Sequence, residues 1–315
     1  MSSPFPLLRL PQLVLCEVFK SLSIGEKIKL SICSKKVSIQ INNDRLYSQK
    51  VIVNLDCLNC KIRVCSENDK DTFQVSIHPD FEISHNSIIQ QVSIAWCTGR
   101  ITSDREEIKT FWKNNRKEGF LSIIQHLLKM FQCKISTDLT FYNRDLYEPT
   151  ISELFDLQVE FKELTFILLK NQNLLWNQIS SNFELVENLR ITSFNNTDFR
   201  LFFTSWPQSI YIIGSAWFTM ENLLACASTT IALYLSHLEN KDLDETLRKW
   251  RGGGLPNIKS LTITSLNFID NGEHILGMDW RDLDGMVIKT DDGSKKATIE
   301  LNPHCIKMSV TPFEM

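Results

Sequence analysis

Cysteine and histidine side chains supply most metal sites and many nucleophiles. Cys57 and Cys60 are separated by two residues, Cys65 follows, and His78 is the next histidine in the chain. A structural zinc site normally has a second close pair of ligands, and no such pair follows here. Free cysteine is among the most buried residue types. Thiols packed beside strands are therefore the simpler interpretation, and we predict no metal site.

Catalytic motifs are absent from the sequence. It contains no phosphate-binding glycine loop, no dinucleotide-binding glycine pattern, no nucleophile elbow and no paired-histidine zinc motif. None of the six histidines has a second histidine four residues away, as a helical metal pair would need. We therefore expect no catalytic residue and no cofactor.

A group of aspartates near the C-terminal end invites a calcium interpretation. It consists of Asp279, Asp282, Asp284, Asp291 and Asp292. The spacing does not meet the EF-hand pattern. The Asp-Gly pairs at 284–285 and 292–293 are instead typical of turns. The second pair predicts a hairpin that joins residues 287–289 to residues 297–299.

Composition excludes several classes of protein. The chain has 315 residues, 43% hydrophobic and 23% charged, with a net charge of −3. These values are those of a soluble globular protein and argue against nucleic-acid binding, which usually needs a basic domain. The longest apolar run, residues 223–235, is too short to span a membrane. The N-terminus lacks a secretory signal pattern, so we expect an intracellular chain, in the cytoplasm or the nucleus, with reduced thiols.

The first 50 residues differ from the rest in charge, with eight Lys or Arg against three Asp or Glu. Pro11 stands where a first helix would begin, and Ser23 is a suitable N-cap for a second helix. Apolar side chains then recur at helical spacing. The first stripe comprises Val14, Leu15, Val18, Phe19 and Leu22, and the later rows comprise Ile24, Ile28 and Ile32, then Cys33, Val37 and Ile41.

A helical segment of this size buries too little surface to be stable alone. Its apolar stripes need a partner, which is either the rest of the chain or another protein. Composition leaves both possibilities open.

Residues 5–41 resemble an F-box. Residues 5–11 read Phe-Pro-Leu-Leu-Arg-Leu-Pro, which is the family's opening pattern, and the apolar spacing and the Lys/Ser/Cys-rich residues 30–36 follow it. The family usually has a Trp or another bulky residue where this chain has Val37. The resemblance implies helices that dock on a Skp-type adaptor, which bridges to a cullin–RING ubiquitin ligase. The adaptor-binding residues that it implies are Leu10, Pro11, Val14, Leu15, Val18, Leu22, Ile28, Ile32 and Val37.

Strand-like apolar runs recur downstream. Aligned on Phe166, Ile191, Ile212, Leu233 and Ile263, they are 25, 21, 21 and 30 residues apart. Most of these steps match the period of leucine-rich repeats. Helices are expected between the strands, at residues 173–180, 198–205, 220–227 and 243–250. We predict an α/β fold, in which a small all-α F-box is followed by an irregular leucine-rich-repeat-like solenoid. A doubly wound sheet is the alternative fold. It should show a ligand-binding loop at the topological switch point, and the sequence has no glycine-rich loop of that kind.

Residues 243–263 resemble the signature of the type 2 F-box-associated domain of a large nematode family. A helix ends in Leu-x-x-Trp at 247–250, Gly252 to Gly254 form a turn, and Pro256 precedes a Leu-rich strand. The resemblance covers the F-box and about residues 150–300. We expect an F-box at residues 1–45, the N-terminal part of the repeat-like region at 46–150, and the F-box-associated domain, with a β-rich end, at 151–315.

Alternate residues of the expected strands point away from the core, since strands have a period of two. A target protein would meet this outward set, which comprises Arg190, Thr192, Tyr211, Tyr234, Ser236, Thr262 and Thr264. The predicted function is a substrate receptor of a cullin–RING ubiquitin ligase, with an unknown protein as its target. A scaffold that acts outside any ligase and an α/β enzyme with an unrecognised site remain the alternatives.

Overall fold

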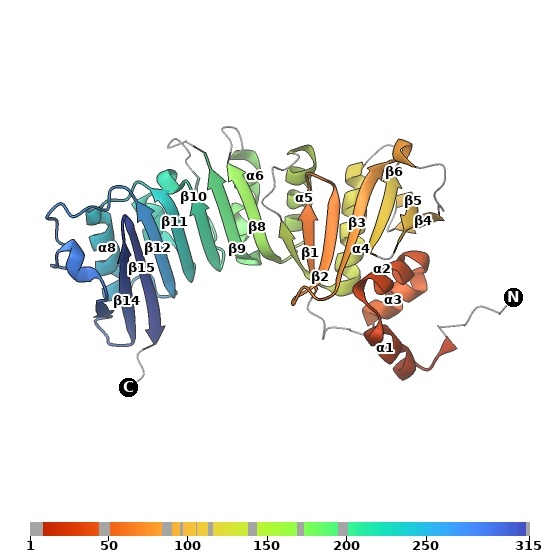
Figure 1. Cartoon of the computed structure of the whole chain (residues 1–315), viewed down its shortest axis with the longest axis horizontal. Helices are drawn as coiled ribbons and strands as arrows, with labels where there is room; N and C mark the ends of the chain where they lie inside the picture. The colour runs from red at the N-terminus through yellow and green to blue at the C-terminus, as the bar shows by residue number, and fades with distance from the viewer. Residues whose placement is uncertain are drawn as a thin grey trace. The chain divides into compact units, whose positions relative to one another are not determined.

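The computed structural model describes residues 9–43, 51–83, 90–94, 97–104, 106–112, 116–137, 144–168, 173–194 and 201–312 (Figure 1). The chain divides into two compact units, Met1–Lys162 and Glu163–Met315. Within the described ranges, no helix has the length and apolar character that crossing a membrane requires.

The first unit begins with three helices that follow one another closely, α1 (Gln12–Ser21), α2 (Ile24–Cys33) and α3 (Lys35–Asn43). Ser23 starts α2 with a capping box, as the sequence predicted. The amide of Glu26 donates to Ser23 Oγ over 3.2 Å, and the amide of Ser23 donates to Glu26 Oε2 over 2.8 Å. Two amides that the helix leaves unpaired are thereby satisfied.

The strands of the first unit hydrogen-bond side by side in the order β7-β1-β2-β3-β6-β5-β4. The pairs β1–β7 and β3–β6 are parallel, and the other neighbours are antiparallel. The bounds are β1 (Val51–Asp56), β2 (Lys61–Ser66), β3 (Thr72–Pro79), β4 (Gln90–Ile94), β5 (Cys97–Ser103), β6 (Glu107–Trp112) and β7 (Lys134–Thr137).

Helix α4 (Arg116–Phe131) supplies much of this unit's core, and α5 (Arg144–Asp156) follows β7. Phe120, Ile124 and Leu127 on α4 are fully buried. Gly119 lets α4 approach the ring of Trp112, because a Cβ there would lie 2.5 Å from the indole. A short 3-10 turn, η2 (Asp80–Glu82), follows β3.

The strands of the second unit run in the order β13-β14-β15-β12-β11-β10-β9-β8. Strands β9 to β12 are parallel to one another, and β15, β14 and β13 continue from β12 as antiparallel strands. The bounds are β8 (Phe161–Leu168), β9 (Val186–Ser193), β10 (Ser209–Ile213), β11 (Thr230–Ser236), β12 (Ser260–Ser265), β13 (Val287–Lys289), β14 (Lys295–Asn302) and β15 (Cys305–Pro312).

Helices and 3-10 turns connect these strands and cover one face of the sheet (Figure 1). On that face Leu189, Ile191, Ile212, Leu233 and Ile263 are fully buried, so the core lies between strands and helices. The connecting elements are α6 (Asn173–Ile179), η3 (Ser180–Leu185), η4 (Ser215–Trp217), α7 (Met220–Ala225), α8 (Asn240–Arg251) and η5 (Trp280–Leu283).

The sequence predicted the mixed α/β class, with helices first and strands after, and this class is confirmed. The expected hairpin is present too, since β13 pairs with β14 in a register that sets Ile288 opposite Ala297. The expected boundaries after residues 45 and 150 remain predictions.

The helix expected at residues 198–205 is wrong where the structure describes it, because residues 201–205 are not helical; residues 198–200 lie outside the described ranges. Aromatic packing explains the difference. The ring of Phe203 stacks on Trp206 at 4.3 Å and meets Trp176 edge-on at 5.0 Å. Trp176 also donates its indole N–H to the carbonyl of Phe202.

Candidate docking surfaces

Helix α1 presents apolar side chains on its outer side. Leu13 is 82% exposed and Val14 is 46% exposed, and Pro11, which precedes the helix, is exposed as well. Pro11 begins the helix without loss, because the first turn does not use its missing N–H. Large apolar side chains so exposed at neighbouring positions are typical of a surface that meets another protein. We call Pro11, Leu13 and Val14 the outer face of α1.

The remaining predicted adaptor residues divide by burial. Leu10, Val18 and Leu22 are half-buried beside the outer face. Four others are buried inside the chain, namely Leu15, Ile28, Ile32 and Val37. These four hold the helices in place, so their side chains do not lie where a visiting protein would contact them. The role of the whole set in adaptor binding remains a prediction.

Two exposed apolar residues of this region escaped the sequence prediction. Leu13 lies outside the stripe formed by residues 14, 15, 18, 19 and 22, and Ile39 on α3 is 46% exposed. The signal for Leu13 was present in the sequence. An apolar residue beside an already complete apolar stripe indicates a second apolar face on the same helix.

Helix α2 packs against the sheet of its own unit. The amide of Ile24 donates to Asp71 Oδ2 over 2.8 Å. Gly25 lies so close to Phe73 that a Cβ on Gly25 would stand 2.4 Å from the ring. Ser31 Oγ is 2.8 Å from Nε2 of His126 on α4. Burial lowers the pKa of His126 to about 4, so this imidazole is neutral at pH 7.

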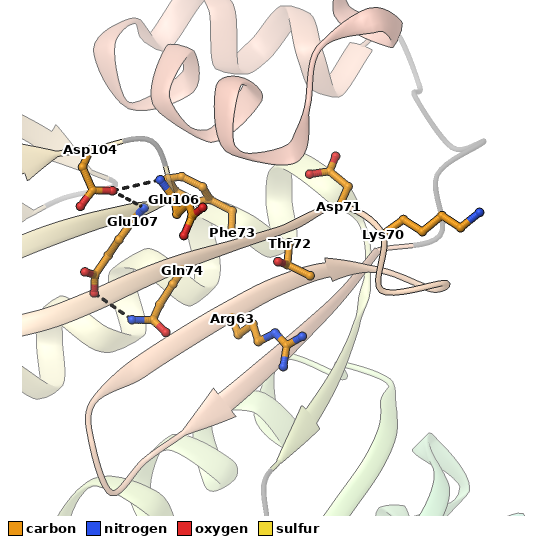
Figure 2. A pocket seen from close by; sticks show the side chains of 9 residues that line it. All are labelled: Arg63, Lys70, Asp71, Thr72, Phe73, Gln74, Asp104, Glu106 and Glu107. Carbon is orange, nitrogen blue, oxygen red and sulfur yellow. Dashed lines mark hydrogen bonds between the residues drawn. The ribbon is translucent and has the colours of Figure 1, made fainter.

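A cleft of about 770 Å³ lies beside these contacts, and side chains of β2, β3 and β6 and of nearby turns line it (Figure 2). Its carboxylates bond to neighbouring parts of the fold. Asp104 Oδ1 accepts the amides of Glu107 at 2.8 Å and Glu106 at 3.0 Å, which hold its pKa below the usual value. Glu107 accepts a hydrogen bond from Gln74. Asp104 and Glu107 thus bond within the sheet and its turns, while Asp71 links the cleft to α2 by accepting the amide of Ile24.

The cysteines considered for zinc are packed in the core. Cys57, Cys60 and Cys65 are all buried, and burial raises the pKa of the Cys57 thiol to about 12. A zinc ligand must be a thiolate, which this environment disfavours. His78 bonds to Glu82 and Ser76. Across the described ranges, no group of three metal-ligating residue types is placed to hold an ion.

The aspartates considered for calcium serve turns and ion pairs. Asp292 accepts the amide of Ser294 in the β13–β14 turn, and Asp284 accepts the amide of Leu301. Asp291 forms an ion pair with Arg251 at 3.6 Å, and Asp279 Oδ1 lies 3.3 Å from Nδ1 of His274. Their separate partners agree with the turn interpretation.

In the second unit, one face of the sheet lies opposite the buried core. The outward side chains of β9 to β12 form this face. Arg190 lies over the ring of Tyr211 at 5.3 Å, and Tyr211 meets Tyr234 with ring centroids 4.9 Å apart. Glu163 pairs with Arg190 at 2.9 Å. Thr192, Thr262 and Thr264 are half-buried on the same face. The structure thus brings most of the predicted outward set together.

Ser236 is a correction, because it is buried at 4% exposure rather than directed outward. The register between β11 and β12 shifts between Leu233 and Ser236. Leu235 occupies the shift with a φ of 55° and is 61% exposed. Such a bulge changes the face on which the following side chain lies. Ser236 Oγ consequently accepts the amide of Leu238.

Comparison with known families adds two matches. The model of the F-box domain matches residues 7–49, and the model described as F-box associated, FBA_2, matches residues 207–263. None of the curated proteins and none of the solved structures compared with the chain matches it. The first match covers α1 to α3, and the second runs from before β10 to the inner part of β12. The chain carries an F-box domain followed by an F-box-associated domain, which indicates an F-box protein of the substrate-receptor class of Skp–cullin–F-box ligases.

Proposed function

We propose that this chain is a substrate-recognition subunit of a Skp–cullin–F-box ubiquitin ligase. Its F-box docks on the Skp-type adaptor, and its second unit holds a target protein. The order of the two domains supports this assignment. The observation that carries it is the outer face of α1, where Leu13 and Val14 remain exposed while Ile24, Ile28 and Ile32 of α2 and Val37 and Ile41 of α3 are buried.

The outer face of α1 has the character of an interface centre. Apolar side chains supply the buried core of a typical interface, and polar groups form its rim. Arg9 is exposed ahead of α1, and Lys20 is exposed near its end, where it pairs with Glu17 at 2.7 Å. The first 50 residues as a whole are basic, with eight Lys or Arg against three Asp or Glu, and such a segment would be steered toward an acidic adaptor.

We propose further that the second unit is a solenoid of the leucine-rich-repeat type. Its four parallel strands, β9 to β12, follow one another in space as in sequence, which supports stacking of neighbouring repeats. Serines recur at the carboxyl ends of the repeats and bond to a neighbouring repeat. Ser193 Oγ donates to the carbonyl of Gly214 over 2.5 Å, and Ser215 Oγ donates to that of Tyr234 over 3.0 Å.

The proposed mechanism is positional. The chain holds the target beside a ubiquitin-loaded enzyme, and the high effective concentration accelerates transfer. No residue of the chain takes part in the chemistry, and no cofactor is needed. The ligase acts in the cytoplasm or the nucleus, where we place this chain.

Adaptor capture with the full chain tests the proposal. Val14→Asp places a charge on the outer face of α1, and we expect it to weaken adaptor binding by tenfold or more, about 1.4 kcal/mol. The double change Leu10→Ala/Pro11→Ala should abolish capture. Leu58→Asp is the matched control, because Leu58 is also apolar and 46% exposed, yet lies in the β1–β2 turn.

Each result has a definite meaning. Undiminished capture of Val14→Asp would exclude the outer face of α1 as the adaptor site. Equal loss with Leu58→Asp would show a general effect of the added charge. Absence of adaptor binding by the unaltered chain would favour a scaffold that acts outside any ligase.

A further inference from the structure

Helix α2 is held at three places by the sheet and by α4 of its own unit. At its start the amide of Ile24 donates to Asp71 Oδ2 over 2.8 Å. In its middle Lys29 lies over the ring of Phe73 at 5.2 Å. Near its end the hydroxyl of Ser31 is 2.8 Å from an imidazole nitrogen on α4. Each contact joins residues that are distant in sequence, so tertiary structure sets where α2 lies.

Asp71 lies in the turn between β2 and β3, and this turn holds its backbone. The amide of Asp71 donates to Ser66 Oγ over 3.1 Å, and the amide of Ser66 donates to the carbonyl of Asp71 over 2.9 Å. Figure 2 shows the carboxylate of Asp71 at the rim of the cleft, directed toward α2. The sheet thus fixes this carboxylate at the place where α2 begins.

The start of α2 needs hydrogen-bond acceptors. The first amides of a helix have no partner within the helix, and the helix dipole attracts negative charge to this end. Ser23 and Glu26 form a capping box within the segment itself. Asp71 adds an acceptor and a negative charge from outside it, at the amide of Ile24. Helix α2 therefore has a local cap and a tertiary cap.

Lys27 gives Asp71 a second role. The side chain of Lys27 is buried, at 1% exposure. Burial lowers the pKa of Lys27, and the charge of Asp71 acts against this by favouring the protonated form. Removal of a counter-charge from a buried charge destabilises a fold. Loss of the Asp71 carboxylate would therefore act on α2 at both Ile24 and Lys27, which lie one helical turn apart.

Helix α1 depends on where α2 begins. Only Leu22 and Ser23 separate the end of α1 at Ser21 from the start of α2 at Ile24. The amides of both connecting residues are bonded, one to a carbonyl of α1 and the other to a carboxylate of α2. The connection is short and ordered, so the contact between Ile24 and Asp71 also sets the direction in which α1 leaves the sheet.

We propose that Asp71 is a positioning residue for adaptor docking. It fixes the start of α2 against the sheet and thereby holds the outer face of α1 in the orientation that the adaptor binds. The proposal rests on the proposed function. It assigns a docking role to a residue that lies outside the F-box match at residues 7–49, and this residue acts through α2 rather than by contact with the adaptor.

The expected effect on affinity follows from the population of the docking geometry. The apparent affinity of a ligand falls in proportion to the fraction of protein molecules in the binding-competent state. Helix ends open locally at a lower cost in free energy than a buried core does. Without the tertiary cap, α1 and the start of α2 leave the docking geometry more often, while the strands beneath them stay folded.

Adaptor affinity is measured with the full chain for the unaltered protein, Asp71→Ala, Asp71→Asn and Asp69→Asn. Asp71→Ala removes both the acceptor and the charge, whereas Asp71→Asn keeps an oxygen that accepts the amide of Ile24. Asp69→Asn is the matched control, because it removes a carboxylate from the same turn that pairs with Arg63 at 3.7 Å. Asparagine tolerates the φ of 54° at Asp69.

We expect Asp71→Ala to bind the adaptor about tenfold more weakly and Asp71→Asn about threefold more weakly, with Asp69→Asn unchanged. Hydrogen exchange on the free chain separates positioning from a general loss of stability. In Asp71→Ala, exchange should rise in α1 and α2 while β1, β2 and β3 keep their protection. Val14→Asp should weaken docking without raising exchange in α2, since it alters the docking surface directly.

Several results would overturn the proposal. Full adaptor affinity in Asp71→Ala would show that docking does not depend on the tertiary cap. An equal loss in Asp69→Asn would show a general effect of charge in the turn. Asp71→Asn decides the matter if Asp71→Ala does not fold. Unchanged affinity of Asp71→Asn, or exchange that rises as much in its strands as in α1, would then overturn the proposal.

The proposed function fails separately. If the unaltered chain does not bind the adaptor, the ligase assignment is refuted, while exchange in α1 of Asp71→Ala still measures whether Asp71 positions that helix. If the unaltered chain and Asp71→Ala bind the adaptor equally well, the ligase assignment stands and the positioning role of Asp71 is refuted.

Discussion

Helices α1 and α2 are neighbours with similar apolar stripes, yet they differ in what covers them. Ile24 and Ile28 of α2 are buried against their own unit, with Gly25 in close contact with Phe73. In α1, Leu15 and its stripe neighbour Phe19 are buried, while Leu13 and Val14 remain exposed. A stripe at helical spacing thus shows that a helix is covered on one side. It does not show whether the chain or a partner provides the cover.

The largest expected effect concerns the covered helix and pH. His126 contacts Ser31 of α2, and burial, with a smaller contribution from Lys129, lowers its pKa from 6.5 to about 4. The unfolded chain therefore binds the proton at a higher pH than the folded chain does. Stability from this group is complete above pH 6.5 and is lost as the pH falls toward 4, by about 3 kcal/mol in total.

Urea unfolding between pH 7 and 4 measures this loss. His126→Gln retains a hydrogen-bonding side chain without the titration, so its stability should fall less over the same range. The difference between the two curves isolates the histidine from the carboxylates that titrate below pH 5. Parallel curves would show that the imidazole is not held neutral beneath α2.

Gly25→Ala is expected to have the next largest effect. Alanine favours helices by about 1 kcal/mol over glycine, but its Cβ would stand 2.4 Å from the ring of Phe73. Overpacking of this kind costs about 1–3 kcal/mol, so we expect net destabilisation in urea. Gly252→Ala is the control, because its Cβ would meet nothing closer than 3.6 Å. A stabilised Gly25→Ala would show that α2 does not pack closely on the sheet.

Periodicity predicted those parts of the fold whose signals are local. Ser23 caps α2 because its side chain and that of Glu26 satisfy amides within one turn, and the Asp-Gly turn at 292–293 joins two strands that pair directly. Residues 201–205 are different, because Phe203 gains contacts with Trp176, which is distant in sequence. The helix propensity of residues 201–205 depends only on local sequence, so it could not predict this contact.

The candidate sites show the same limit. Tyr211 and Tyr234 were predictable because strand alternation places them on the outward face. Ser236 was not, because a bulge at Leu235 changes the alternation within the strand, and nothing in the sequence marks a leucine for a left-handed conformation. The exposure of Leu13 could have been predicted, because Leu13 is an apolar residue beside a stripe that is already complete.

The smallest expected effect on stability is that of Leu13→Ser, and it probes the uncovered helix. Leu13 is 82% exposed, so the change should alter the free energy of unfolding by no more than about 0.5 kcal/mol. Phe81→Ser is the control, since Phe81 is 86% exposed and lies on η2 of the same unit. Both variants should unfold like the unaltered chain, while Leu13→Ser alone weakens adaptor capture by about tenfold. If Leu13→Ser lowered the free energy of unfolding by more than about 1 kcal/mol, the chain itself would cover this face of α1. Helix α1 would then resemble α2, whose apolar residues are buried within its own unit.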